Sequence, residues 1–221
     1  MASMELRHLR LKLFERLWPP ISRRARRRRM QVFLQRMGVR PGLRILDLGG
    51  HPEIWRPVET PLDITILNVP GCVEKREDLH HRIHYVEGDA CNVVGLAPGK
   101  FDLVFSNSVI EHVGAEARQQ DFAQEVRRLG RAYWVQTPSR WFPVEAHCGM
   151  PLWWFYPSAL RQMLLRRWRP MLPAWTEMVA GTRVLSRRRL GELFPESRIY
   201  VEYGFGFPKS YVAYWSADER S

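Results

Sequence analysis

Short apolar runs alternate with longer polar segments through the middle of this 221-residue chain. Five such runs predict β-strands: RILDL (44–48), ITILNV (64–69), IHYVEGD (83–89), FDLVFSN (101–107) and RAYWVQT (131–137). Strands that alternate with crossover segments of this length are typical of a parallel, doubly wound α/β sheet. We therefore predict a Rossmann-like sheet, and sheets of this kind bind ligands outside the carboxyl ends of their strands.

The two ends of the chain have a different pattern. RIYVEYG (198–204) and KSYVAYWS (209–216) flank FGFP, which predicts an antiparallel hairpin and brings the mostly parallel sheet to seven strands. Residues 4–18 place leucines at helical spacing among basic side chains, and a second helix is expected from about 22 to 37. We expect a basic N-terminal helical cap (1–38), a main domain (39–216) that includes an aromatic-rich substrate lid (141–180), and a short tail (217–221).

Charge is concentrated in two segments. The net charge is +11, and residues 1–40 alone carry twelve Lys or Arg and two acidic residues, while residues 161–189 carry eight and one. Such segments attract phosphate, so contact of the N-terminal basic helix with a membrane surface and contact with nucleic acid both stay open. Three cysteines without metal spacing, no signal-peptide pattern and no long apolar run lead us to expect a cytoplasmic protein.

Polar residues stand where the first four predicted strands end. Asp47 is followed by Gly49 and Gly50, which allow a ligand to approach the backbone closely. Asn68 comes 21 residues after Asp47, near the spacing at which nucleotide-binding sheets place a ribose-binding side chain. Asp89 and Asn107 end the third and fourth runs. Each residue alone is explained by a turn or a helix cap, but together they predict one ligand site at one edge of the sheet.

With ILDLGG, ITILNV, VEGDA, FDLVFSNSVIEHV and the final hairpin in this order, the chain resembles the class I S-adenosylmethionine-dependent methyltransferases over roughly residues 30–216. The resemblance implies S-adenosylmethionine as cofactor. It also implies roles for these residues: Asp47, Gly49 and Gly50 under the methionine part; Asn68 at the ribose; Asp89 and Ala90 at the adenine; and Ser106 and Asn107 at the methionine end. The chain departs from the family twice, because its loop reads DLGGHPE and its ribose residue is an amide. The amide lacks the charge-assisted bond of a carboxylate.

Glu111 and His112 follow the fourth strand, where we expect a helix to begin, and His147 follows the fifth. A histidine can take a proton from a hydroxyl group at neutral pH, so these three residues are candidate catalytic groups, with local packing as the alternative. Similar methyltransferases that bind magnesium have Glu-x-x-Glu-His at this place. Because Ser108 replaces the first Glu, no metal site is expected.

The aromatic stretch after the fifth strand, TPSRWFPVEAHCGMPLWWFYP, can wall an apolar substrate cavity or form core under a helical cap. We favour methyl transfer to a small molecule, to an oxygen atom of a hydrophobic or glycan-like acceptor. Two alternatives remain open. One is an RNA methyltransferase, suggested by the basic arm. The other is a non-catalytic binding protein, suggested by the altered loop, Asn68 and Ser108. The oligomeric state is not predicted.

Overall fold

A computed structural model describes residues 24, 26–72 and 80–216 of the chain. The predicted helix over 4–18 and the predicted tail over 217–221 lie outside the described residues. Within the described part, no helix is both long enough and apolar enough to cross a membrane.

Seven strands form one sheet in the order β3-β2-β1-β4-β5-β7-β6. Their bounds are β1 Arg44–Leu48, β2 Asp63–Asn68, β3 Arg82–Glu87, β4 Leu103–Asn107, β5 Ala132–Pro138, β6 Arg198–Gly204 and β7 Phe207–Ser216. The first five strands pair in parallel, whereas β7 pairs antiparallel with both β5 and β6. This confirms the predicted doubly wound, mostly parallel sheet with a C-terminal antiparallel hairpin.

Each predicted strand is present within two residues of its expected bounds. Two boundaries matter for the site. β3 ends at Glu87, so Asp89 lies in the loop beyond the strand rather than at its last position. The helix after β4 was predicted to begin near Glu111, but α2 covers Glu116–Leu129. Gly114 adopts φ +118°, a backbone conformation outside the right-handed helix, and the helix forms only after it.

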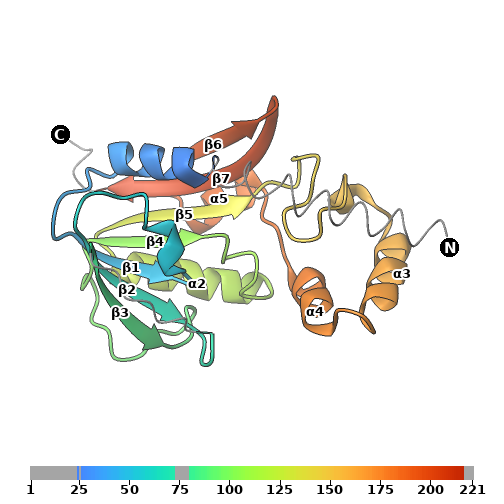
Figure 1. Ribbon diagram of the computed structural model, residues 1–221, viewed down its shortest axis with the longest axis horizontal. Helices are drawn as coiled ribbons and strands as arrows, with labels where there is room; N and C mark the ends of the chain where they lie inside the picture. Colours follow the sequence, from blue (N-terminus) through green and yellow to red (C-terminus); the bar gives the residue numbers. More distant parts are fainter. Residues whose placement is uncertain (1–23, 25, 73–79, 217–221) are drawn as a thin grey trace.

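Helices cover both faces of the sheet (Figure 1). α2 and α5 (Arg187–Leu193) pack on one face, where Phe122, Val126 and Leu190 are fully buried. The helix over 26–36 covers the other face together with the short 3-10 helix η1 (Pro52–Ile54). Phe33 from that helix packs edge-on against the rings of three aromatic core residues, Trp55, Phe105 and Trp134. The β1–β4–β5 region is therefore buried on both sides, as its continuous apolar runs require.

A helical extension projects from one end of the sheet (Figure 1). It contains η2 (Trp153–Phe155), α3 (Ser158–Trp168) and α4 (Pro173–Gly181). The indole of Trp168 stacks on that of Trp153 with centroids 5.5 Å apart and lies 5.3 Å from that of Trp175. Part of the aromatic stretch thus forms the internal packing of the extension.

Candidate active site

The loop after β1 is shaped by two glycines. Gly49 has φ +69°, and a Cβ there would lie 2.6 Å from Cγ2 of Val109. A Cβ on Gly50 would lie 1.8 Å from Oδ2 of Asp47. Both positions therefore exclude a side chain, one by backbone conformation and contact and the other by contact alone. The chain keeps glycine where close approach demands it, although His51 and Pro52 replace the usual continuation of the loop.

The loop is held by a buried polar contact. Trp55 Nε1 donates to Asp47 Oδ2 over 2.8 Å, and both residues are fully buried. Burial raises the pKa of the Asp47 carboxyl to about 7, although the bond from Trp55 opposes this shift. Oδ1 of Asp47 is buried and has no hydrogen-bond partner among the described residues. His51, at the end of the loop, caps η1 by accepting from the backbone N–H of Glu53.

Asn68 is the last residue of β2, and Asp89 lies in the loop just beyond the neighbouring strand β3. Asn68 Nδ2 donates to the carbonyl oxygen of Gly50 over 2.8 Å, so this side chain links β2 to the glycine loop. Asp89 accepts from the backbone N–H of Cys91 and forms an ion pair with Arg118 at 2.7 Å. The hydrogen bonds from Arg118 hold the pKa of Asp89 below its ordinary value, and burial opposes this. Asp89 is thus an anion at neutral pH.

Ser106 and Asn107 are the last two residues of β4, and their side chains make different contacts. The Ser106 hydroxyl is fully buried and donates to the carbonyl oxygen of Leu48, so it ties β4 to β1. Asn107 Oδ1 accepts from Arg29 over 2.5 Å. Arg29 comes from the helix over 26–36, and it also donates to Gln136 on β5 and to Glu202 on β6. A buried arginine therefore joins the N-terminal cap to the predicted methionine end of the site.

Three candidate catalytic residues meet after β4. His112 Nε2 lies 2.9 Å from His147 Nε2, although 35 positions separate the two residues in the sequence. Glu111 is fully buried and accepts from the Thr137 hydroxyl. Burial raises the pKa of Glu111 to about 7. Ligand atoms of Glu111, His112 and His147 lie within 4.8 Å of one another, so these residues could together hold a cation.

The hydrogen bonds of the two imidazoles define where their protons lie. Glu145 accepts from Nδ1 of His147 over 2.7 Å, so Nε2 of neutral His147 carries a lone pair. The Thr182 hydroxyl donates to the carbonyl oxygen of Met178, which leaves its oxygen to accept from Nδ1 of His112 at 3.4 Å. In this tautomer Nε2 of neutral His112 also carries a lone pair, whereas in the other tautomer Nε2–H of His112 donates to Nε2 of His147. In both arrangements the 2.9 Å separation is satisfied by one proton between the two nitrogens.

Burial and charge divide the pKa values of this pair. Burial, and then the charge of His147, lowers the pKa of His112 to about 4. Burial also disfavours the charged form of His147, but the hydrogen bond and charge of Glu145 outweigh it and raise the pKa of His147 above its ordinary value. The same contacts, with help from the backbone N–H of Cys148, hold the pKa of Glu145 below its ordinary value despite burial. The pair therefore takes up one proton, stabilised by a buried carboxylate.

Comparison with known proteins bears on this site. Residues 60–132 match a family model described as a methyltransferase domain. This match covers about a third of the chain, from the loop before β2 to the start of β5. The strand order of this chain, its glycine loop and its final antiparallel hairpin have the arrangement of the class I methyltransferase fold. No curated protein matches the chain.

Solved structures share this fold at low identity. Phosphoethanolamine N-methyltransferase 2 of Haemonchus contortus, in complex with S-adenosyl-L-methionine, is 17% identical with a TM-score of 0.51, covering 78% of this chain and 37% of its own. A protein of Rhodobacter sphaeroides named for Zn-dependent alcohol dehydrogenases is 15% identical with a TM-score of 0.55, covering 84% and 87%. A protein of Anabaena variabilis assigned to methyl transfer in antibiotic biosynthesis is 16% identical with a TM-score of 0.52, covering 79% and 63%. The chain thus spans only about a third of the nematode enzyme, and these likenesses show the fold alone.

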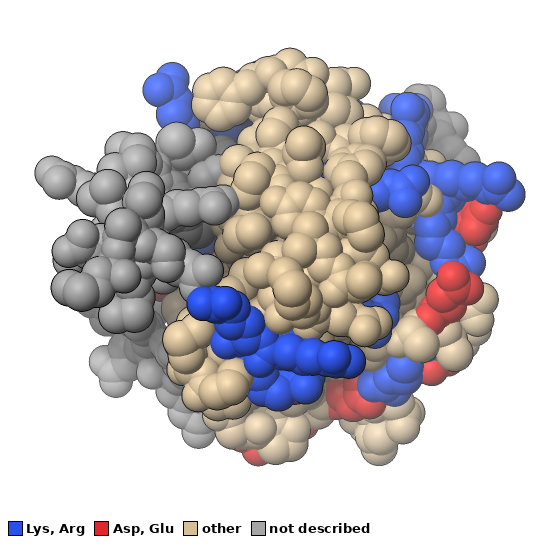
Figure 2. Space-filling view, turned by 90° about the vertical axis from the view of Figure 1, so that its right-hand side faces the viewer, with Lys and Arg blue, Asp and Glu red and all other residues tan. Residues whose placement is uncertain are grey.

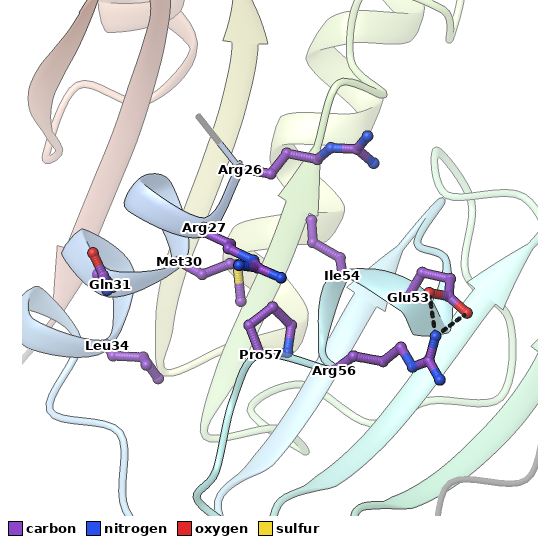
Figure 3. Close-up of a pocket in the computed structure, with 9 residues that line it drawn as sticks. All are labelled: Arg26, Arg27, Met30, Gln31, Leu34, Glu53, Ile54, Arg56 and Pro57. Atoms are coloured by element: carbon purple, nitrogen blue, oxygen red, sulfur yellow. Dashed lines mark hydrogen bonds and ion pairs between the residues drawn. The ribbon is translucent and has the colours of Figure 1, made fainter. Parts of the chain in front are cut away.

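Two grooves are present in the described part of the chain. One, of about 770 Å³, lies between the helix over 26–36 and η1 (Figure 3). It is bordered by Arg26, Arg27 and Arg56, and Arg56 is held by Glu53. The other, of about 790 Å³, is almost wholly apolar. Its lining residues are Trp141, Pro143, Pro151, Leu152, Phe155, Phe207, Pro208 and Tyr211. The predicted apolar cavity after β5 is present as this open groove, with β7 as its second wall.

Several residues of the site could not be identified from the sequence. Arg29 stands within a cluster of arginines, and nothing local distinguishes it from its exposed neighbours. Glu202 and Gln136, which bind it, lie on strands that read as ordinary alternating segments. Trp55 carried one usable signal, since tryptophan side chains are highly buried on average even in a polar stretch.

Proposed function

We propose that this methyltransferase domain transfers the methyl group of S-adenosylmethionine to a hydroxyl oxygen of a small-molecule acceptor that has an apolar part. The observation that carries this proposal is the chain Glu145–His147–His112 beside the strand ends, because it provides a proton acceptor where the acceptor hydroxyl must lose its proton. The cofactor, when bound, supplies a methyl group on a positively charged sulfur.

The residues present suit this cofactor. Gly49 and Gly50 leave room for a ligand against the backbone, and the buried Asp47 has an unpartnered oxygen below the loop. Asn68 holds Gly50 through its amide nitrogen, and we assign its amide oxygen to a ribose hydroxyl. We assign Asp89 and Ala90 to the adenine, and Ser106 and Asn107 to the methionine end. Of these, Ser106 acts by tying β4 to β1 rather than by contact.

The reaction needs few protein groups. The acceptor oxygen forms a bond to the methyl carbon while the carbon–sulfur bond breaks, and the sulfur keeps that electron pair and becomes a neutral thioether. The hydroxyl proton passes to the Nε2 lone pair of the His112–His147 pair, and Glu145 stabilises the imidazolium that results. Glu111, buried below His112, adds negative potential when ionised.

The acceptor's apolar part is assigned to the groove walled by Trp141 and Phe155, whose ring centroids lie 5.2 Å apart. A polar glycan without an apolar portion fits this lining less well. Membrane contact of the helix expected over 4–18 stays an open alternative, since residues 4–18 lie outside the described residues.

Two measurements test the proposal in order. Titration calorimetry with S-adenosylhomocysteine tests cofactor binding. If no binding is measured, the proposal is wrong. Formation of S-adenosylhomocysteine is then followed with a panel of hydroxylated acceptors that differ in apolar content. We expect turnover with amphipathic alcohols or phenols, and a higher KM in Phe155→Ala with unchanged affinity for S-adenosylhomocysteine. Turnover with RNA alone would instead favour an RNA methyltransferase.

A further inference from the structure

Exposed apolar side chains gather at one end of the molecule. Twelve large apolar residues of the described chain are exposed, and ten of them lie in the helical extension, the loop that leads to it and the β6–β7 turn. These ten form what we call the end face: Trp141, Leu152, Phe155, Leu160, Met163, Met171, Leu172, Tyr203, Phe205 and Phe207. Scattered apolar residues are normal on protein surfaces, but a concentration of this kind marks an interaction site.

Part of the end face is joined by the apolar groove, which is lined by Trp141, Leu152, Phe155 and Phe207. The apolar groove joins the β6–β7 turn to the loop before α3, because Phe207 and Phe155 both line it. Seen from the side of the extension, the surface is a broad uncharged area with Lys and Arg, and some Asp and Glu, around it (Figure 2). The most prominent members are turn residues, with Phe205 82% exposed and Met171 64% exposed.

α3 lacks the buried apolar face that surface helices of globular proteins normally have. It has eleven residues and none of them is buried, although it carries four large apolar side chains and a tryptophan. Its Trp168 packs within the extension, whereas Met163 is 57% exposed. Helices of this length gain most of their stability in water from packing an apolar face, so α3 presents to solvent a surface that another phase or partner would cover.

The charges around the end face select the partner. Arg166, Arg167 and Arg169 stand exposed at the end of α3, and Arg140 lies over the Trp141 ring at 5.6 Å. Residues 139–181 contain five arginines and two acidic residues. Of those two, Glu145 is buried and Glu177 is paired with Arg169. An apolar centre with an arginine margin complements a surface that is negatively charged outside and apolar beneath.

We infer that the end face docks on an anionic phospholipid bilayer. Several of its most exposed residues lie in turns and on the surface of a helix, from which side chains can insert into a deformable lipid phase. Aromatic side chains such as Tyr203, Phe205 and Phe207 favour the boundary between lipid and water. The arginines meet lipid phosphates, while the aromatic tip inserts among the upper acyl segments.

Docking would also bring the apolar groove next to methyl acceptors that reside in the membrane. The groove opens on the end face, so an acceptor whose apolar part resides in the membrane can enter it without crossing water. Trp175 Nε1 donates to the carbonyl oxygen of His147, which connects the extension to the proton-accepting pair. This substrate assignment rests on the proposed function, whereas membrane docking does not and is measured without cofactor or acceptor.

Co-sedimentation with vesicles tests the docking. The full chain is mixed with vesicles of pure phosphatidylcholine, and with vesicles that contain 30 mol% phosphatidylglycerol. We expect binding to the anionic vesicles that is at least tenfold stronger than to the neutral ones and that weakens with added salt. Phe205→Ser/Phe207→Ser should weaken it about tenfold or more by removing inserted apolar area. Arg166→Gln/Arg167→Gln should weaken it to a similar extent.

Matched controls separate the end face from other surfaces. Val94→Ser removes an 83% exposed apolar residue elsewhere, and Arg187→Gln/Arg188→Gln removes two cations from α5; both should leave vesicle binding within twofold. Urea unfolding confirms that each variant is folded. If the end-face variants bind vesicles as wild type does, the basic N-terminal arm carries the binding and the inference is wrong. The inference is equally wrong if the wild-type protein does not bind vesicles and instead forms a dimer that Phe205→Ser/Phe207→Ser dissociates.

Discussion

The indole of Trp55 donates to the carboxyl group of Asp47 across the glycine loop, and both side chains are fully buried. This bond fixes the loop from below while Asn68 fixes it from the side through Gly50. The loop therefore keeps a defined shape even though His51 and Pro52 replace glycine-rich sequence. A buried carboxyl group at this place also makes the stability of the domain depend on pH.

Asp47→Asn should flatten the pH dependence of stability. The folded-state pKa of Asp47 is about 7, and its unfolded-state value is about 4. Between these values the folded protein holds a proton that the unfolded chain has released, so the free energy of unfolding falls as pH rises from about 4 to about 7. The full effect of one such group is on the order of 4 kcal/mol.

Urea unfolding of the cofactor-free protein at several pH values measures this decline. Glu111 has a similarly raised pKa, so we expect Asp47→Asn to remove about half of the decline rather than all of it. Asparagine can still accept from Trp55, which keeps the loop contact. A decline that is unchanged in the variant would contradict the assignment.

Gly50→Ala should weaken cofactor binding by more than tenfold, because its Cβ would collide with the Asp47 carboxyl group and push the loop outward. Gly191→Ala is the matched control. It lies in α5 with open space around it, and we expect it to stabilise the protein by about 0.5–1 kcal/mol through helix propensity. Calorimetry with S-adenosylhomocysteine and thermal unfolding measure the two effects. Equal cofactor affinity in both variants would show that the loop is not part of the site.

Asn68→Ala removes the bond to the Gly50 carbonyl oxygen and the proposed bond to a ribose hydroxyl. Each bond contributes about 1 kcal/mol, so affinity for S-adenosylhomocysteine should fall about tenfold or more. Binding of adenosine and of methionine, measured separately, shows which part of the cofactor Asn68 contacts. The variant should lose affinity for adenosine but not for methionine, and the reverse pattern would place Asn68 at the wrong part of the cofactor.

Arg29→Met should cost about 3 kcal/mol or more of stability, because it leaves the Glu202 carboxylate buried beside only Ser210 and Lys209. Arg29→Met/Glu202→Met should recover much of this loss. Arg44→Met breaks the exposed pair with Asp102 and serves as control, with an expected cost below about 1 kcal/mol. Urea unfolding compares the variants. A loss in Arg29→Met no larger than that in Arg44→Met would argue against a structural role for this network.

Glu145→Gln should shift the pH profile of methyl transfer. In wild type, kcat/KM should rise with pH as the His112–His147 pair gives up its shared proton, with a midpoint above the ordinary histidine value because Glu145 stabilises the charged form. Without this carboxylate the midpoint should move to lower pH, and the maximal rate should fall because the imidazolium is less stabilised. Glu192→Gln, on the exposed surface of α5, should change neither. A profile that is flat in wild type would remove the pair as proton acceptor.

The sequence by itself determined the sheet. Alternating apolar and polar positions are local, and β1 and β6 end where the pattern ends. The same locality placed Asp47, Asn68 and Asn107 at the last or next-to-last positions of their strands, because strand ends follow directly from the apolar runs. The helix start after β4 was wrong, since the apolar spacing of Val109 and Val113 continues through a turn that Gly114 ends.

Only the tertiary structure decided which distant residues meet. His147 reaches His112, Arg29 reaches Asn107, and Trp55 reaches Asp47 through contacts between elements whose spacing along the chain carries no period. The aromatic stretch after β5 suited both core and cavity wall, and the sequence favoured the cavity slightly. Folding sorted it by burial, with Trp153 inside the extension and Phe155 on its surface. Periodicity fixes which face of an element is apolar, but only packing decides whether that face is covered by protein or left open to a ligand or a membrane.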